Sequence, residues 1–197
     1  FRGERAQGTW TVRVVDDAGG DVLTVSDIVI RTYGVASSND RYVFTNEYSD
    51  YDGIAGHATA ISDSNGGTDT VNASAVTSNS VIRLDGVAGS IDGVGVSFTN
   101  IEHAIGGDGN DDLYGSSAIN QLHGMRGADE LFGGQGLDTL YGGTGNDTLN
   151  GGLDKDSSYG GDGNDRFVVS FGNFGDNAYG GSGTDTLDMS AALTTVP

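Results

Sequence analysis

GGDGNDDLY, residues 106–114, opens a run of seven nine-residue phrases that continues without a gap to Val168. The next six read GSSAINQLH, GMRGADELF, GGQGLDTLY, GGTGNDTLN, GGLDKDSSY and GGDGNDRFV, so a glycine begins every phrase. The first six positions suit a tight turn, because glycine adopts positive φ without steric cost and small polar residues favour turns. The last three positions predict a short strand whose middle residue is apolar in six of the seven phrases: Leu113, Leu122, Leu131, Leu140, Leu149 and Phe167.

This nine-residue period predicts an all-β fold, a right-handed parallel β-roll (a β-solenoid). A single short strand cannot bury its apolar residue alone, whereas stacked turns build a continuous core. Two phrases would form one coil of turn, strand, turn and strand, with the leucines of two sheets interdigitating. A flexible glycine-rich linker is the competing interpretation. It is disfavoured because a linker has no reason to place leucine and aspartate at every ninth residue.

Aspartate occupies the sixth position of six phrases, and this indicates a bound cation. Stacking would bring together aspartates from phrases two apart, and their charges would repel unless a cation lay between them. Calcium accepts about six to eight oxygen ligands, which carboxylates and turn carbonyls supply. Zinc is a poor candidate because the chain has no cysteine and its three histidines are scattered. We therefore expect Ca²⁺, in agreement with the resemblance of the phrase to the G-G-x-G-x-D-x-U-x repeat of RTX proteins.

The register predicts that the phrases beginning at 106, 124, 142 and 160 line one edge of the roll, here called the first edge. Their glycines and aspartates are intact except that Met125 replaces a second-position glycine, so we predict three sound sites. The later phrase GGSGTDTLD, at 180–188, is expected to add a fourth site. The expected metal-binding residues of this edge are Gly106, Asp108, Asp111, Gly124, Arg126, Gly127, Asp129, Gly142, Thr144, Gly145, Asp147, Gly160, Asp162, Gly163, Asp165, Gly180 and Asp185.

The second edge, formed by the phrases beginning at 115, 133 and 151, is less regular. Asn120 stands for aspartate and Ala118 for glycine in the first of these phrases, while Asp154 and Ser158 replace a glycine and an apolar residue in the last. We expect weaker or partly empty sites there. The eleven residues from 169 to 179 are predicted to be irregular. The expected metal-binding residues of the second edge are Gly133, Gly136, Asp138, Gly151 and Asp156.

Composition points to a calcium-dependent secreted module. A formal charge of −19 and 35 glycines in 197 residues favour an expanded chain when no ion is bound, so folding and calcium binding should be one event. Acidity argues against nucleic acid and anionic membranes as partners, and no segment is long and apolar enough to span a membrane. The absence of cysteine fits an extracellular bacterial protein. Because Phe1 follows no initiator methionine, we expect a fragment of a longer protein.

Residues 1–34, FRGERAQGTWTVRVVDDAGGDVLTVSDIVIRTYG, predict two strands around a turn. The segment resembles the last strands of the P domain of kexin-like and some bacterial subtilisin-like proteases, which implies a domain remnant at 1–36. Leu23 and Ile28 depart from that pattern, where glycine and tryptophan are usual, and an ordinary hairpin is the alternative. The matching residues are Phe1, Gly3, Glu4, Gly8, Thr9, Trp10, Thr11, Asp16, Asp21, Tyr33 and Gly34.

Residues 37–188 resemble the C-terminal domain of serralysin-type secreted metalloproteases, through SSNDRYVFTNEYSDYDG (37–53), ISDSNGGTDTVNASA (61–75), VIRLDGVAGSIDGVGVSF (81–98) and NIEHAIGGDGNDDLYG (100–115). The resemblance implies a strand-rich cap at 37–105, a roll at 106–188 and a tail at 189–197. By analogy, Asp63 and Asp69 would hold a further calcium ion. A solvated turn is the alternative for these two residues.

The chain shows no catalytic motif: neither H-E-x-x-H nor G-x-S-x-G occurs. We therefore expect a non-catalytic calcium-binding module of a larger secreted protease, subtilisin-like according to the resemblance of residues 1–34. RTX proteins of this kind leave the cell through type I secretion machinery and fold in external calcium, so the expected partners are that machinery in transit and the parent's catalytic domain. An accessory module of a polysaccharide-modifying enzyme, such as an alginate epimerase, and an adhesin segment are the alternatives.

The ninth position of the phrases should face outward, and it is rich in rings. Such residues either stack on their neighbours along a sheet, which we favour, or dock another domain or a carbohydrate. The residues at this position are Tyr114, His123, Phe132, Tyr141, Asn150, Tyr159 and Val168.

Overall fold

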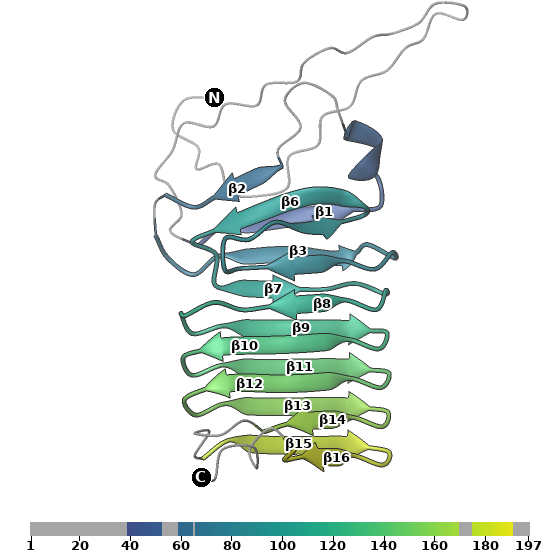
Figure 1. Ribbon diagram of the computed structural model, residues 1–197. Coiled ribbons are helices and arrows are strands. Elements are labelled where there is room, and N and C mark those ends of the chain that lie inside the picture. Colours follow the sequence, from purple (N-terminus) through teal and green to yellow (C-terminus); the bar gives the residue numbers. More distant parts are fainter. Residues whose placement is uncertain (1–38, 53–58, 65, 170–174, 191–197) are drawn as a thin grey trace, which may run out of the picture. The chain divides into compact units, whose positions relative to one another are not determined.

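The computed structural model describes residues 39–52, 59–64, 66–169 and 175–190, which lie within one unit spanning residues 38–197. The strands expected at residues 1–36 and most of the tail expected at 189–197 fall outside the described residues. Within the described part, the structure is a parallel β-solenoid with a strand-rich cap at its N-terminal side (Figure 1). The predicted all-β fold is confirmed.

Successive strands of the roll alternate between two parallel sheets. The first sheet contains β9 (Gln121–Arg126), β11 (Thr139–Thr144), β13 (Ser157–Asp162) and β15 (Asn177–Ser182). The second contains β8 (Asp112–Tyr114), β10 (Glu130–Gln135), β12 (Thr148–Leu153), β14 (Arg166–Val168) and β16 (Thr186–Asp188).

Several strands are longer than the three residues that the sequence predicted. Strands β9 to β13 and β15 each span six residues, because the backbone ladder runs on into the opening glycines of the next phrase. Gly134, for example, pairs with Gly152. The ends of the strands therefore lead directly into the turns, and their pairing holds the turns of neighbouring coils in register.

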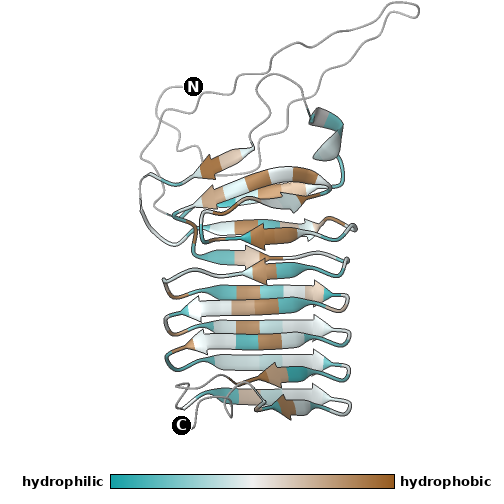
Figure 2. Ribbon diagram, viewed as in Figure 1, coloured by the Kyte–Doolittle hydropathy of each residue, from teal (hydrophilic) through white to brown (hydrophobic). Residues whose placement is uncertain are grey.

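The eighth-position side chains form the core of the roll. Leu131 pairs with Leu149 in one sheet and Leu122 with Leu140 in the other, and all four are buried. Figure 2 shows the apolar residue near the middle of β9 to β12 and its absence from β13, where buried Ser158 stands. The predicted leucine core is confirmed, and Ser158 is its polar exception.

The cap continues both sheets. Strands β1 (Arg41–Thr45), β3 (Thr70–Ala75) and β7 (His103–Ile105) extend the first sheet, whereas β4 (Val81–Arg83), β5 (Gly89–Ile91), β6 (Val94–Thr99) and β2 (Ala60–Ser62) extend the second. The pairs β4–β5 and β5–β6 are antiparallel. A short 3-10 turn, η1 (Ser49–Tyr51), follows β1. Larger apolar residues fill the core here, with Phe44 packing edge-on against Phe98 at 5.9 Å between ring centroids.

The ninth-position rings stack along the outer faces of both sheets. Tyr141 lies 4.4 Å from His123 and 5.0 Å from Tyr159 between ring centroids, and Tyr114 stacks on Phe132 at 5.0 Å. The Arg83 guanidinium lies 4.0 Å from the centroid of the Tyr114 ring and binds Asp85. The prediction that these rings stack on their neighbours is confirmed, and stacking covers ring faces that a ligand would otherwise contact.

Candidate metal centre

The sixth-position aspartates of the first edge form a hydrogen-bonded column. The Oδ1 atom of Asp129 accepts the backbone N–H of Asp111 at 2.8 Å, and Asp147 accepts that of Asp129 at 2.8 Å. The pattern repeats from Asp147 to Asp165 at 2.9 Å and from Asp165 to Asp185 at 3.0 Å. Each turn therefore points its carboxylate into the roll, and one oxygen of each carboxylate is used to hold the preceding coil.

A second column runs along the other edge. Asp138 accepts the backbone N–H of Asn120 at 2.8 Å, Asp156 accepts that of Asp138 at 2.8 Å, and Asp176 accepts that of Asp156 at 3.0 Å. Asp176 was missed by the sequence analysis, which treated residues 169–179 as irregular. That prediction is wrong for 175–179: the letters GDNAY match positions five to nine of a phrase, and β15 begins at Asn177. The signal was hidden because the spacing from Asp156 is 20 residues instead of 18.

The second oxygen of these carboxylates is the feature that indicates a bound ion. The Oδ2 atom is buried and has no hydrogen-bond partner in five aspartates of the roll. A buried carboxylate oxygen without a partner is destabilising by about 1–3 kcal/mol or more, unless a proton or a cation satisfies it. The five are Asp129, Asp147 and Asp165 on the first edge and Asp138 and Asp156 on the second.

The opening glycine of each phrase leaves room for a cluster of oxygens. A Cβ atom on Gly124 would lie 2.3 Å from the Asp129 Oδ2 atom and 2.6 Å from the carbonyl oxygen of Gly142. The same contacts recur at Gly142 and Gly160. A carboxylate oxygen and a carbonyl oxygen from the next coil therefore face one small space, which is the kind of oxygen-rich, flexible ligand set that calcium prefers.

The fourth-position glycines stack the turns closely. Gly127, Gly145 and Gly163 have φ values of 119°, 131° and 137°, and a Cβ on Gly145 would lie only 1.7 Å from the carbonyl oxygen of Gly127. On the second edge, Gly136 has φ 115° and a looser contact, 2.7 Å to the carbonyl oxygen of Ala118. These glycines shape the turn, and their role in metal binding stays a prediction.

Third-position side chains lie on the outside of the turns. Asp108, Arg126, Thr144 and Asp162 are exposed, and the Arg126 guanidinium forms an ion pair with Asp108 at 2.9 Å. These four residues were expected to bind metal, but their side chains do not point into the roll. Fifth-position asparagines, which the sequence analysis did not single out, link the turns instead: Asn146 Oδ1 accepts the N–H of Asn164 at 2.7 Å. Their recurrence at 110, 146 and 164 was the available signal.

Burial changes the protonation of the aspartates. Removal from water, with the charge of neighbouring aspartates added to it, raises the pKa of Asp129 and of Asp138 from 3.8 to about 7. Desolvation likewise raises the pKa of Asp147 and Asp156 to about 6. The two edges are alike in this respect. A divalent cation would reverse these shifts by stabilising the charged form.

A separate acidic cluster lies in the cap. Carboxylate oxygens of Asp40, Asp63 and Asp69 all lie within 4.8 Å of one another, and Asp63 and Asp69 are buried. Asp69 Oδ1 accepts the N–H of Asp40 at 2.5 Å, while its Oδ2 atom is buried without a partner. Burial raises the pKa of the nearby Tyr42, and the charges of the three aspartates raise it further. The structure thus brings the predicted pair together and adds Asp40.

The family model of the RTX calcium-binding nonapeptide repeat, which describes four copies, matches residues 105–140 and 133–167. No curated protein matches the chain. In the described part of the chain, no helix has the length and apolar character needed to cross a membrane. Residues 105–167 are RTX calcium-binding nonapeptide repeats, and with the strands around them they form a β-roll that binds calcium.

Proposed function

We propose that calcium binding and folding of this β-roll are one event, so that the module stays unfolded where calcium is scarce. The observation that carries the proposal is the set of five buried Oδ2 atoms without a hydrogen-bond partner. Folding without an ion leaves these oxygens unsatisfied and stacks like charges in a chain whose formal charge is −19. Calcium binds only the folded arrangement and stabilises it by mass action.

Circular dichroism of the chain with calcium, and with a chelator in place of calcium, tests this coupling. We expect a β-sheet signal with calcium and its loss with the chelator, and magnesium at the same concentration serves as the control for ionic strength. Magnesium is a suitable control because it requires stricter octahedral geometry and gives up its water reluctantly. The same β-sheet signal under all conditions contradicts the proposal.

The acidic cluster of the cap is proposed as a further calcium site, formed by Asp40, Asp63 and Asp69. Three carboxylates within 4.8 Å of one another, two of them buried, repel each other unless a cation or protons lie among them. Asp69→Asn should lower the number of calcium ions bound, measured by equilibrium dialysis. Asp52→Asn is the matched control, because Asp52 is exposed. An unchanged ion count in the Asp69 variant contradicts this site.

For the biological role, we propose a module that stabilises a secreted protease after type I secretion. RTX repeats are typical of secreted bacterial proteins, and residues 37–188 resemble the C-terminal domain of serralysin-type proteases. The test uses the full-length parent protein, secreted through type I machinery, with Asp147 intact or replaced by Asn. We expect the variant to lose proteolytic activity sooner during heating in calcium. A parent that carries a polysaccharide-modifying domain in place of a protease contradicts the proposal.

A further inference from the structure

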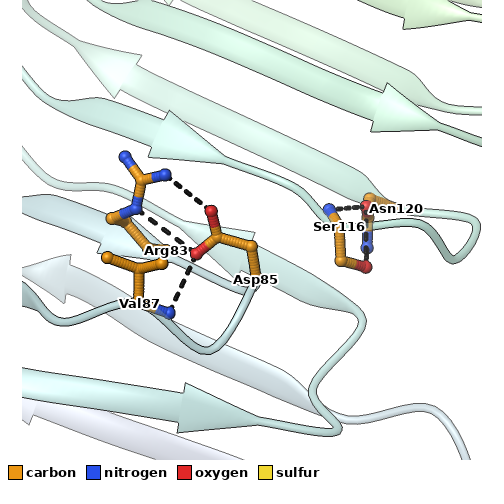
Figure 3. Close-up of polar contacts among 5 residues, drawn as sticks. All are labelled: Arg83, Asp85, Val87, Ser116 and Asn120. Atoms are coloured by element: carbon orange, nitrogen blue, oxygen red, sulfur yellow. Dashed lines mark hydrogen bonds and ion pairs between the residues drawn. The ribbon is translucent and has the colours of Figure 1, made fainter.

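The turn of the second edge that contains Asn120, here called the Asn120 rung, satisfies its buried polar atoms without an ion. Asn120 is 1 % exposed, and it occupies the sixth position, where the following phrases of that edge have Asp138 and Asp156. Its Oδ1 atom accepts the N–H of Ser116 at 2.6 Å, and its Nδ2 atom donates to the carbonyl oxygen of Glu102 at 2.7 Å (Figure 3 shows Asn120 and Ser116). Neither side-chain atom lacks a partner, in contrast to the two aspartates.

The amide reverses the hydrogen bond that the aspartates make to the preceding coil. Asp138 and Asp156 each accept an N–H from the residue 18 positions earlier. Asn120 instead donates to a carbonyl 18 positions earlier, that of Glu102. A carboxylate at residue 120 could not make this bond, because it has no donor, and its oxygen would face the carbonyl oxygen at hydrogen-bond distance.

The rung also lies at a junction. The Glu102 side chain accepts the N–H of Asp69 at 2.8 Å, so Glu102 contacts a member of the acidic cluster of the cap through its carboxylate and Asn120 through its carbonyl. On the other side, the backbone N–H of Asn120 donates a hydrogen bond to the Asp138 carboxylate. Hydrogen bonds therefore connect the cap cluster to the carboxylate column of the second edge, and Asn120 is the uncharged member of the series.

We propose that Asn120 is an ion-free rung at a latent calcium position: its carboxamide takes the place of the cation and ties the cap to the roll at a coil that binds no ion of its own. The oxygens that surround the metal positions elsewhere are present here too. A Cβ on Gly115 would lie 2.5 Å from Asn120 Oδ1 and 2.0 Å from the carbonyl oxygen of Gly133. This inference rests on the proposed calcium-coupled folding of the roll.

Asn120→Asp tests the proposal, with equilibrium dialysis and thermal melting of the whole chain as the two measurements. The variant should bind one calcium ion more per chain than the wild type, since the new carboxylate would face the Glu102 and Gly133 carbonyl oxygens and all three groups favour a cation. At limiting calcium it should melt at a lower temperature than the wild type, because two oxygens then face each other. An unchanged ion count overturns the proposal, even if the melting temperature falls.

Two variants keep the outcome interpretable. Asn146→Asp adds the same charge on an exposed turn, where the side chain acts only as an acceptor for the N–H of Asn164, so its ion count should not change. Asn120→Ala removes the amide without adding charge and should lower the melting temperature equally at limiting and at saturating calcium. If wild-type melting does not respond to calcium, the proposed function fails. If it responds but Asn120→Asp gains no ion, only the ion-free rung fails.

Discussion

The two edges of the roll share one backbone arrangement but differ in how closely their sequences follow the repeat. On the first edge the carboxylate column runs from Asp111 to Asp185 without interruption, whereas on the second edge Asn120 stands before the first carboxylate, Asp138. Asp138 and Asp156 are as buried as Asp129 and Asp147. In all four residues the Oδ2 atom has no hydrogen-bond partner. Departures in the turn sequence therefore do not by themselves remove the carboxylate geometry. Weaker binding on the second edge stays a prediction, and the variants and conditions below test it.

The largest expected effect comes from removing one charge in the middle of either column. Asp147→Asn on the first edge should lower stability in calcium by about 2.7 kcal/mol for each site lost, if calcium is at about 100 times its Kd. In chelator, where the wild-type roll is unfolded, the same change should shift the equilibrium towards the folded chain, because a buried charge without a partner disappears. Asp138→Asn should behave alike if the edges are equivalent, and less strongly if the second edge is weak. Chemical denaturation in calcium and the β-sheet signal by circular dichroism in chelator measure the two effects.

A single direction of change in both conditions contradicts this account. If neither variant has more β-sheet signal than the wild type in chelator, the carboxylate is held by something other than an ion. Asp52→Asn, on the exposed turn after β1, is the control and should change stability little in either condition.

The next effect concerns how tightly the turns stack. Gly145→Ala should destabilise the roll by about 2 kcal/mol or more, because φ is 131° and the new Cβ would lie 1.7 Å from a backbone carbonyl oxygen. Gly136→Ala on the second edge meets its neighbour at 2.7 Å and should cost less. Thermal melting in calcium ranks the two. Equal losses would show that the edges stack with the same tolerance.

The pH dependence should have opposite signs with and without calcium. Because burial raises the pKa of Asp129 and Asp138 from 3.8 to about 7, the folded chain holds more protons than the unfolded chain between these values. Stability in chelator should therefore be highest below about pH 4 and fall as pH rises towards 7. In calcium, stability should rise over the same range, since the ion displaces the protons. Melting curves at about pH 4 to 8 in buffers of fixed ionic strength check this, and parallel curves contradict it.

The smallest effect concerns two residues that adopt a glycine-like conformation. Met125 on the first edge and Asp154 on the second have φ values of 85° and 77°. Met125→Gly should raise stability by about 1 kcal/mol or less, as the relief of strain is offset in part by the flexibility of glycine. Asp154→Gly should gain less, because Asp154 Oδ2 accepts the N–H of Gly136 at 3.2 Å. Differential scanning calorimetry resolves such shifts, and a loss in the Met125 variant would show that its side chain stabilises the turn.

Much of the fold and of the site followed from the nine-residue period. The positions of Leu131 and Asp129 within their phrase were enough to predict the core column and the carboxylate column, since both recur at a fixed spacing. The hydrogen bonds from the backbone N–H of one aspartate to the carboxylate of another were not predictable, because they depend on the rise between coils. Asp176 was obscured by a two-residue change in spacing, and the role of Asp40 depends on strand pairing between β1 and β3. Strand lengths were underestimated because glycine was taken to mean turn.

A crystal structure grown in calcium, with anomalous scattering recorded at long wavelength, tests the central claim most directly. The account predicts calcium peaks in contact with the Oδ2 atoms of Asp129, Asp147 and Asp165, and with those of Asp138 and Asp156 where the second edge binds. No peak should contact the Asn120 side chain. A folded roll in which all five Oδ2 atoms contact no calcium would contradict the account.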